Sequence, residues 1–203
     1  MSAEGLLCRG LLYIAILGSA SSTIYLLMVL VGAFRFHREA KLTRKRTLSL
    51  QSALPPVTIF KPVHGMEARL EENLDSFFRQ DYPVFEVIIG ARGAENPALQ
   101  VAERVARRHP NIPTRIVISG PPTWPNAKVF SLSKMIPASS NDFFVISDSD
   151  VRVGCDFLRN VVPPLLDPAM GLVTCLYKGV PGGDFWSLLE ALGMSVEMPS
   201  GVV

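Results

Sequence analysis

The sequence has few cysteines and almost no net charge, and each shortage excludes a class of protein. Its three cysteines, Cys8, Cys155 and Cys175, are odd in number and widely spaced, which fits neither a zinc site nor a disulfide framework. We therefore expect buried thiols in a reducing compartment. The net charge is +2, and no basic stripe is interleaved with aromatic residues, so no nucleic-acid partner is expected. The 203 residues contain no internal repeat and suffice for one medium domain with an appendage.

One stretch near the N-terminus contains no charged residue at all. Residues 11–34 are apolar apart from a few Ser, Thr and Tyr, and a helix of this length, at about 1.5 Å per residue, crosses the roughly 30 Å core of a membrane. A cleaved signal peptide and a buried core helix are the alternatives. The apolar run continues well past a conceivable cleavage site at residues 18–20, and only Arg9 supplies a basic n-region. We therefore predict a short tail at 1–10 and a transmembrane helix at 11–34.

Basic residues follow this stretch directly. A single acid, Glu39, accompanies a series of Lys, Arg and His residues. These are Arg35, His37, Arg38, Lys41, Arg44, Lys45 and Arg46. The positive-inside rule then places the N-terminus outside and the rest on the cytoplasmic side of the inner membrane. Residues 35–54 are thus predicted to form a basic juxtamembrane linker that lies against anionic headgroups, and a solvated basic linker is compatible with the same placement.

From residue 55 onward, strand and helix patterns alternate. Short apolar runs rich in β-forming residues predict strands at 57–60, 85–90, 114–119, 143–146 and 171–177. Apolar residues at helical spacing predict helices at 67–78, 98–108, 126–135 and 157–166. Such alternation is typical of a mostly parallel sheet with helices on both faces. We therefore predict one α/β domain over residues 55–203.

Two acids stand at the end of the fourth predicted strand. Asp148 and Asp150 follow the apolar run 143–146 and are two residues apart, so on an extended chain their side chains point the same way. Two carboxylates at a strand end suit a hard cation such as Mg²⁺ or Mn²⁺ and leave positions open for phosphate oxygens. In open α/β sheets, ligands bind at this edge. A polar turn in which Asp148 caps the following segment is the alternative.

Further polar residues are expected at the same edge of the sheet. Lys61 and Lys128 are candidates to neutralise phosphate oxygens, and a solvated surface charge is the alternative for each. Asn126 is placed to cap a helix whose N-terminus favours a nearby anion. His64 lies near this edge, where a structural or merely exposed histidine is the alternative.

Several sequence blocks resemble the ceramide-glucosyltransferase-like branch of the family 2/21 (GT-A) glycosyltransferases, and among these the members associated with hopanoid biosynthesis. The blocks lie between residue 55 and the end of the chain and occur in the same order and spacing as in that family. They are Phe60-Lys61-Pro62 with Gly65, Asn73-Leu74 with Phe77-Phe78, Gln80-Asp81-Tyr82-Pro83 with Glu86-Val87, Asn126-Ala127-Lys128, and Ile146 to Val153. The leading membrane helix and basic linker also match the family's layout.

The resemblance implies a GT-A (Rossmann-like) fold and a membrane-anchored enzyme. Such enzymes transfer a hexose, with inversion, from a nucleotide sugar, usually UDP-linked, to a lipid hydroxyl at the cytoplasmic face, here in glycolipid or hopanoid biosynthesis. By position, Asp148 and Asp150 would hold the divalent metal that bridges the diphosphate. Lys61 and Lys128 lie in matching blocks and would contact the nucleotide.

The sequence departs from the family pattern in two places. After the second predicted strand the family carries an Asp that meets the uracil, whereas this chain has Gly93, with Glu95 as a possible substitute. The family's general base lies well beyond the acidic motif, so it is expected beyond Val203, and the chain is expected to be truncated at its C-terminus. Glu190 and Glu197 are the last acids, in an apolar helical stretch, and neither is assigned as the base.

Two other functions stay open at this point. One is a family 2 transferase that uses a different acceptor, such as a polyprenyl phosphate or a growing polysaccharide. The other is a non-catalytic, membrane-tethered remnant that binds a nucleotide sugar without turning it over, which Gly93 and the missing base favour.

Overall fold

The computed structural model describes residues 3–49 and 54–202. The chain divides into two compact units, which are Thr47–Val173 and Met1–Arg46 together with Thr174–Val203. The first unit holds the sheet and the candidate site, and the second holds two helices. Each unit is described by itself.

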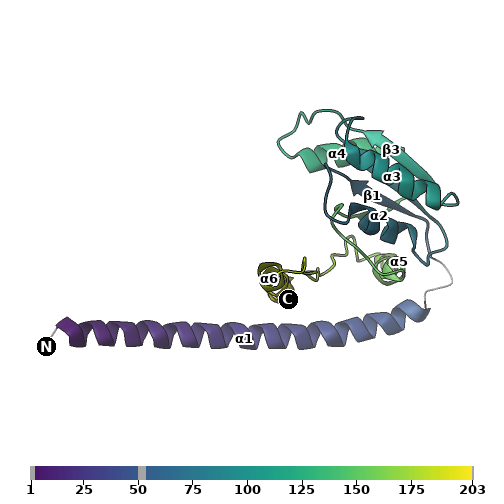
Figure 1. The fold of residues 1–203 in the computed structure, drawn as a ribbon. Helices are drawn as coiled ribbons and strands as arrows, with labels where there is room; N and C mark the ends of the chain where they lie inside the picture. The colour runs from purple at the N-terminus through teal and green to yellow at the C-terminus, as the bar shows by residue number, and fades with distance from the viewer. Residues whose placement is uncertain (1–2, 50–53, 203) are drawn as a thin grey trace. The chain divides into compact units, whose positions relative to one another are not determined.

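The unit Thr47–Val173 is built on a four-stranded sheet, shown with its helices in Figure 1. Its strands are β1 (Val57–Pro62), β2 (Phe85–Ala91), β3 (Thr114–Ile118) and β4 (Phe143–Ile146). They are arranged in the order β3-β2-β1-β4, and every neighbouring pair is parallel. The parallel sheet predicted from the sequence is confirmed. Because all four strands run the same way, the loops that follow them leave the sheet at one edge.

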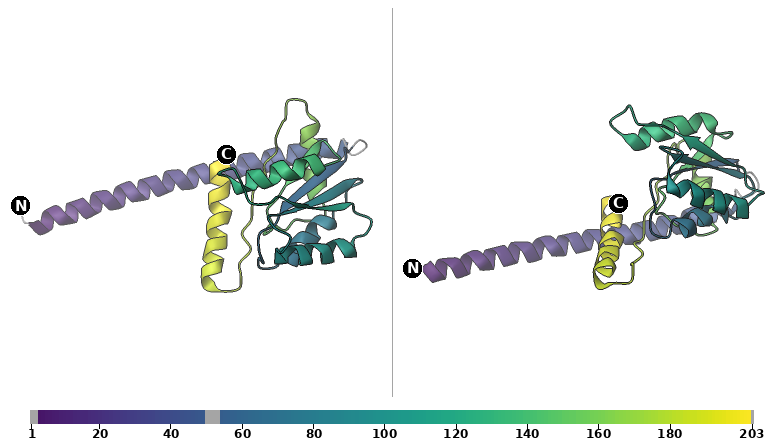
Figure 2. Two further views of the ribbon diagram at one scale, coloured as in Figure 1. Left: turned by 90° about the horizontal axis from the view of Figure 1, so that it is seen from above. Right: turned by 45° about the horizontal axis from the view of Figure 1, so that its top comes forward.

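Helices cover both faces of this sheet, as the two views in Figure 2 show. α2 (Leu70–Phe78) and α3 (Pro97–Arg108) pack on one face together with the short α5 (Phe157–Val161), and α4 (Ala127–Met135) packs on the other. Successive strand residues point to opposite faces, so Ile59 contributes to the larger core under α2 and α3 while Phe60 packs with Ile88 and Met135 under α4. A hydrophobic core on each face of the sheet therefore fixes the strands from which the loops of the candidate site leave.

Glycine at position 90 lets α4 come close to β2. A Cβ atom at Gly90 would lie only 2.3 Å from Sδ of Met135, whose side chain is fully buried. The absence of a side chain in β2 therefore creates the space that the last residue of α4 fills.

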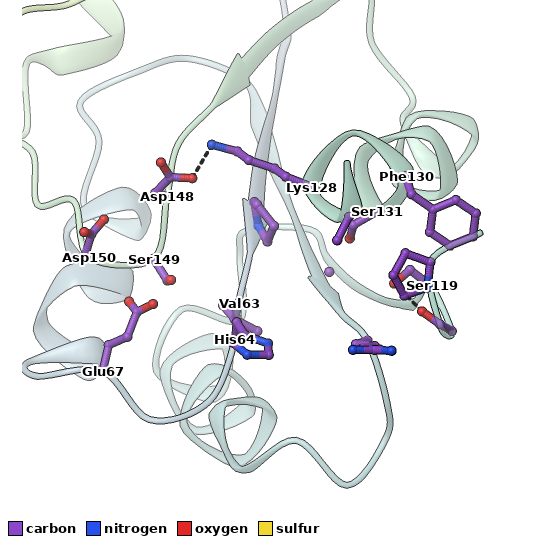
Figure 3. Close-up of a pocket in the computed structure, with 16 residues that line it drawn as sticks. Val63, His64, Glu67, Ser119, Lys128, Phe130, Ser131, Asp148, Ser149 and Asp150 are labelled. Carbon is purple, nitrogen blue, oxygen red and sulfur yellow. Dashed lines mark hydrogen bonds and ion pairs between the residues drawn. The ribbon is translucent and has the colours of Figure 1, made fainter. Parts of the chain in front are cut away.

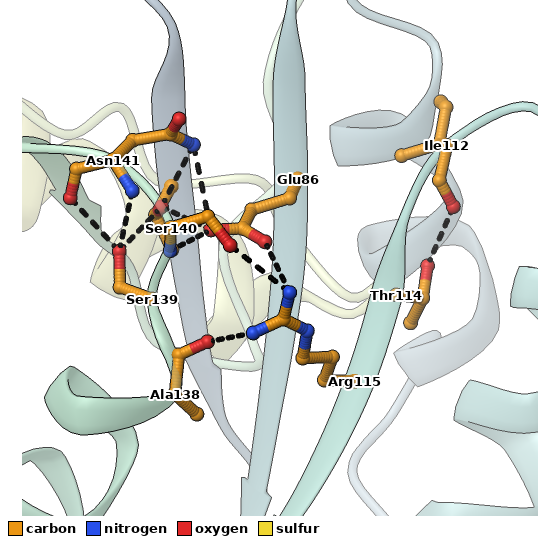
Figure 4. A network of polar contacts seen from close by, with 9 residues as sticks. Glu86, Ile112, Thr114, Arg115, Ala138, Ser139, Ser140 and Asn141 are labelled. Atoms are coloured by element: carbon orange, nitrogen blue, oxygen red, sulfur yellow. Dashed lines mark hydrogen bonds and ion pairs between the residues drawn. The ribbon is translucent and has the colours of Figure 1, made fainter.

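A buried polar network ties the opposite, amino-terminal edge of the sheet together (Figure 4). Glu86 is only 4% exposed, and its carboxylate accepts hydrogen bonds from Thr58 Oγ1 and from the backbone N–H of Ser140, both at 2.7 Å. The Asn141 side chain donates to Thr58 Oγ1 at 3.1 Å. This network joins β1 and β2 to the segment that leads into β4, and it lies away from the edge where ligands are expected.

Three predicted elements differ from those in the structure. Residues 171–177 form no strand, because no neighbouring strand pairs with them in the described part of the chain, and β-forming residues need such a ladder. The helix predicted at 157–166 ends at Val161 and continues as a 3₁₀ turn, η3 (Pro163–Leu166), since Pro163 and Pro164 lack the N–H groups of an α-helix. α2 begins only at Leu70, because Arg69 has a left-handed backbone (φ 58°).

The second unit holds the long N-terminal helix α1 (Ala3–Ser49) as far as Arg46, and the helix α6 (Phe185–Val202). α1 includes the predicted span at 11–34 and continues through the basic residues that follow it. Within α1, the 32 residues Cys8–Glu39 are long and apolar enough to cross a membrane. Their side chains are almost all exposed, as expected of a helix that faces lipid.

The prediction of buried thiols is wrong. Cys8, Cys155 and Cys175 are all free and exposed. Cys8 lies on the surface of α1, whereas the other two lie in connecting segments after the sheet, where neither faces a core. Wide spacing along the chain therefore excluded a zinc or disulfide pattern but gave no information on burial.

Candidate functional site

The loops that leave the carboxyl ends of the strands line an open pocket of about 370 Å³, a volume within the range of small-molecule sites. Figure 3 shows its lining. The lining residues come from the segments after β1, β2, β3 and β4 and from the first turn of α4. They include Pro62, Val63, His64, Glu67, Gly90, Arg92, Ser119, Gly120, Pro122, Ala127, Lys128, Phe130, Ser131, Asp148, Ser149 and Asp150. The prediction that these loops meet at one edge is confirmed.

The segment after β4 presents its acids outward and its serines inward. Ser147 and Ser149 are buried, with 7% and 6% exposure, whereas the Asp148 side chain is 50% exposed and Asp150 is also exposed. The backbone N–H of Ser147 donates to the carbonyl of Phe60 at 3.2 Å, which fastens the segment to β1. Asp148 and Asp150 are both among the lining residues. The segment is not extended there, because residues 149–150 form a turn in which the N–H of Val151 donates to the carbonyl of Asp148 at 3.4 Å, so the convergence of the two carboxylates on one cation stays a prediction.

Lys128 lies across the pocket from these acids. Its ammonium forms an ion pair with the Asp148 carboxylate, drawn as a dashed line in Figure 3, and both side chains are about half-exposed. Asn126 is the N-cap of α4, as predicted: its side-chain oxygen accepts from the N–H groups of Lys128 and Val129, each at 3.1 Å. Because the cap uses this oxygen and Asn126 is not among the lining residues, its contribution is to hold the α4 terminus that carries Lys128.

Lys61 lies beneath the pocket and not in its lining. Its side chain is fully buried, and its ammonium donates to Ser147 Oγ at 3.3 Å and to the backbone carbonyl of Asp148. Burial lowers the pKa of Lys61 from 10.5 to about 7, although the carboxylates of Asp148, Asp150 and Glu67 act in the opposite direction. Direct contact between Lys61 and a nucleotide stays a prediction.

Glu95 fills the space left by Gly93. A Cβ atom at Gly93 would lie 2.1 to 2.5 Å from the carboxylate atoms of Glu95. The Glu95 carboxylate therefore stands where a side chain on residue 93 would be. Neither residue lines the pocket, and the role of Glu95 toward a ligand stays a prediction.

Glu67 is a lining residue that the sequence did not single out. Its Oε2 atom is buried without a hydrogen-bond partner among the described residues, and in Figure 3 its side chain points up toward Asp150. It lies just before α2, in the turn that ends at Arg69. The sequence pattern placed Glu67 in a helix at 67–78, whereas α2 begins three residues later, at Leu70, so Glu67 was not expected in a loop at the pocket.

The acids in the pocket suit a cation that shares its ligands with phosphate. The described residues hold no group of three or more His, Cys, Asp or Glu that could enclose a metal by themselves. Mg²⁺ is commonly bound by one or two carboxylates and completes its shell with phosphate oxygens and water. Asp148 and Asp150 supply such hard oxygen ligands from one short segment, so the donor set fits Mg²⁺ or Mn²⁺ bound together with a diphosphate.

Comparison with known proteins gives consistent matches. Residues 14–203 match the model of a protein family described as Glycosyl transferase family 21. A ceramide glucosyltransferase of Komagataella phaffii is 34% identical over 160 residues, which are 77% of this chain and 31% of that protein. Ceramide glucosyltransferase 1 of Caenorhabditis elegans is 30% identical over 113 residues, which are 56% of this chain and 24% of that protein. The chain thus spans about a third or less of these relatives.

A solved structure matches the fold. A mannosyltransferase from Pyrobaculum calidifontis, in complex with GDP-Man and Mn²⁺, has a TM-score of 0.55 and 25% identity, and the match covers 80% of this chain and 49% of that one. Together with the parallel sheet, this likeness confirms the GT-A fold class expected from the sequence.

Proposed function

The chain belongs to glycosyl transferase family 21, and we propose that it binds a nucleotide sugar and takes part in the transfer of its hexose to a lipid hydroxyl at a membrane surface. The observation that carries this proposal is the pocket at the carboxyl edge of the sheet, where Asp148, Asp150 and Lys128 face one space. Acids for a cation and an ammonium for phosphate are what a nucleoside diphosphate requires.

In this proposal, Asp148 and Asp150 would hold Mg²⁺ or Mn²⁺ together with the diphosphate of the donor. The bound cation would neutralise negative charge on the leaving nucleotide diphosphate. Lys128 exchanges its present partner, Asp148, for a phosphate oxygen, and Asn126 keeps the helix terminus beneath it in place.

We further propose that Glu95 takes the role of the acid that the family resemblance places after the second strand. Its carboxylate stands within 2.5 Å of where a Cβ on Gly93 would be, so it offers a carboxylate from nearly the same place. A carboxylate there accepts an N–H of the nucleobase, which favours UDP as the carrier.

The acceptor side of the proposal rests on α1 and on the relatives. The apolar segment Cys8–Glu39 suits a membrane anchor, and the basic residues after it favour the cytoplasmic face of the inner membrane. The matching relatives are named ceramide glucosyltransferases, so a sphingoid or polyisoprenoid lipid, including a hopanoid, is the acceptor class we propose. The described residues are assigned to the donor, and no general base is assigned among them.

Binding and transfer are tested on the full chain in lipid nanodiscs. UDP-glucose is titrated by calorimetry with and without Mn²⁺, and transfer of labelled glucose to extracted lipid is followed. The double variant Asp148→Asn, Asp150→Asn should lose Mn²⁺-dependent binding, whereas Lys134→Met, an exposed lysine on α4 outside the pocket, should not. Absence of binding for UDP-glucose, UDP-N-acetylglucosamine and GDP-Man alike would show that the proposal is wrong.

A second candidate is binding of the nucleotide sugar without transfer. It is favoured by the assignment of both strand-end carboxylates to a cation, which leaves the acceptor hydroxyl without a base among the assigned residues. The same experiment separates the two, because this candidate shows Mn²⁺-dependent binding but no labelled lipid.

A further inference from the structure

Lys61 is a charged residue placed in a hydrophobic core. Positions 57, 59 and 61 of β1 share one face, and there the buried side chains Val57 and Ile59 pack under α2 and α3. Lys61 continues this row and is fully buried. Its ammonium lies 3.8 Å from the centroid of the Phe77 ring, so an aromatic face of α2 covers the charge from one side.

Burial of an ammonium ion is costly unless hydrogen bonds and nearby negative charge compensate it. Here the compensation comes from the segment after β4: Ser147 Oγ accepts at 3.3 Å, and the backbone carbonyl of Asp148 accepts a second hydrogen bond. An uncharged side chain of similar length would fill the same space without this cost. We therefore expect the role of the Lys61 charge to lie in its contacts with the acidic segment after β4.

Two consecutive residues of β1 hold two consecutive residues of this segment. The carbonyl of Phe60 accepts from the N–H of Ser147 at 3.2 Å, and Lys61 binds the carbonyl of Asp148. With its backbone held from below, the segment turns its serines inward and leaves the Asp148 side chain half-exposed in the pocket. The buried positive charge also offsets repulsion between the carboxylates above it.

We propose that Lys61 is a positioning residue, whose buried ammonium holds the backbone of Asp148 so that the carboxylates of Asp148 and Asp150 stand in the pocket in the arrangement that a divalent cation needs. This inference rests on the proposed function, because it takes the acidic segment as the cation site. Because Lys61 lies beneath the pocket and outside its lining, this inference has it act through the segment, in place of the direct nucleotide contact predicted from the sequence.

The test compares the full-length wild type with Lys61→Met in nanodiscs, and Lys134→Met serves as the matched control. Without any ligand, hydrogen exchange of the backbone amides at residues 147–151 should be about tenfold faster in Lys61→Met, while the amides of β2 keep their protection. With UDP present, the affinity for Mn²⁺, read by electron paramagnetic resonance, should fall about tenfold, which corresponds to about 1.4 kcal/mol. Unchanged exchange and unchanged Mn²⁺ affinity in Lys61→Met would overturn the inference.

Two further outcomes are decided by the same measurements. If Lys61→Met accelerates hydrogen exchange throughout the sheet, the variant Ser147→Ala, which removes one acceptor of Lys61, is tested instead. Faster exchange confined to residues 148–151 in Ser147→Ala supports the inference. Unchanged exchange at these residues overturns the inference. If the wild type binds no Mn²⁺ with UDP, the proposed function fails, and with it the link to a cation, whereas the exchange data still decide whether Lys61 holds the segment.

Discussion

The ammonium of Lys128 and the carboxylate of Asp148 form an ion pair across the pocket, which joins the first turn of α4 to the segment after β4. Both side chains are about half-exposed, so the pair contributes little to folding, on the order of 0 to 1 kcal/mol. In the proposed complex the two groups would part: Asp148 would bind the metal ion, and Lys128 would bind a phosphate oxygen. Lys128 and Asp148 are therefore the two residues of the proposed donor site whose roles are easiest to test separately from folding.

Replacing Lys128 tests this connection. Lys128→Met should leave the thermal stability of the chain within about 0.5 kcal/mol, because exposed ion pairs are weak. It should lower the affinity for UDP about tenfold, because a hydrogen bond between charged groups contributes about 1.5 to 3 kcal/mol. Calorimetric titration of UDP with Mn²⁺ measures the effect, and Lys134→Met is the control. Equal UDP affinity in Lys128→Met and wild type would contradict the role of Lys128.

The contact between Glu95 and Gly93 makes a paired prediction. Glu95→Ala should weaken UDP binding about threefold to tenfold, and Gly93→Ala should act similarly, because its Cβ displaces the Glu95 carboxylate. Since that carboxylate is the mobile end of an exposed side chain, both variants should keep wild-type stability. The affinities for UDP and GDP are measured by calorimetry, with Glu103→Ala on the exposed face of α3 as the control. An unchanged preference between UDP and GDP in both variants would exclude a base-reading role.

A glycine-to-alanine change in the sheet should be far more damaging. In Gly90→Ala, the new Cβ would meet the fully buried Met135 side chain at 2.3 Å, so the free energy of unfolding should fall by about 1 to 3 kcal/mol. Shortening the opposing residue should relieve the clash, and a double-mutant cycle with Met135→Ala should show a coupling of about 1 kcal/mol or more. Denaturant unfolding of the four proteins gives the cycle. If the two losses of unfolding free energy simply add, the prediction is wrong, and α4 moves away from β2 to accommodate the new Cβ atom.

The network around Glu86 should matter for folding and not for binding. Glu86→Ala removes the acceptor of the buried Thr58 Oγ1 and of the partly buried Ser140 N–H, which should cost about 1 to 3 kcal/mol of unfolding free energy. UDP affinity of the folded fraction should be unchanged, since the network lies at the opposite edge of the sheet from the pocket. Denaturant unfolding and calorimetry check both parts, with Glu103→Ala as the surface control. A loss of UDP affinity in a fully folded Glu86→Ala would contradict this separation.

Local sequence patterns were sufficient for the framework of the α/β domain. Alternating strand and helix periods predicted five strands, four of which form the parallel sheet, and the two acids directly after the apolar run 143–146 predicted carboxylates at the carboxyl edge of that sheet. The uncharged run 11–34 predicted the apolar part of α1. These features depend on neighbours within a few residues, which is the range that periodicity and capping rules cover.

Tertiary contacts decided what the local patterns left open. Lys61 points into the core because its position in the pleat follows Val57 and Ile59, and only the fold supplies the Asp148 carbonyl, from 87 positions along the chain, that compensates its charge. Residues 171–177 have strand-forming side chains but no strand beside them. Burial and long-range hydrogen bonds arise between segments that come together only when the chain folds. The sequence by itself therefore determined the sheet and the acids at its edge. The tertiary structure determined which side chains face the pocket.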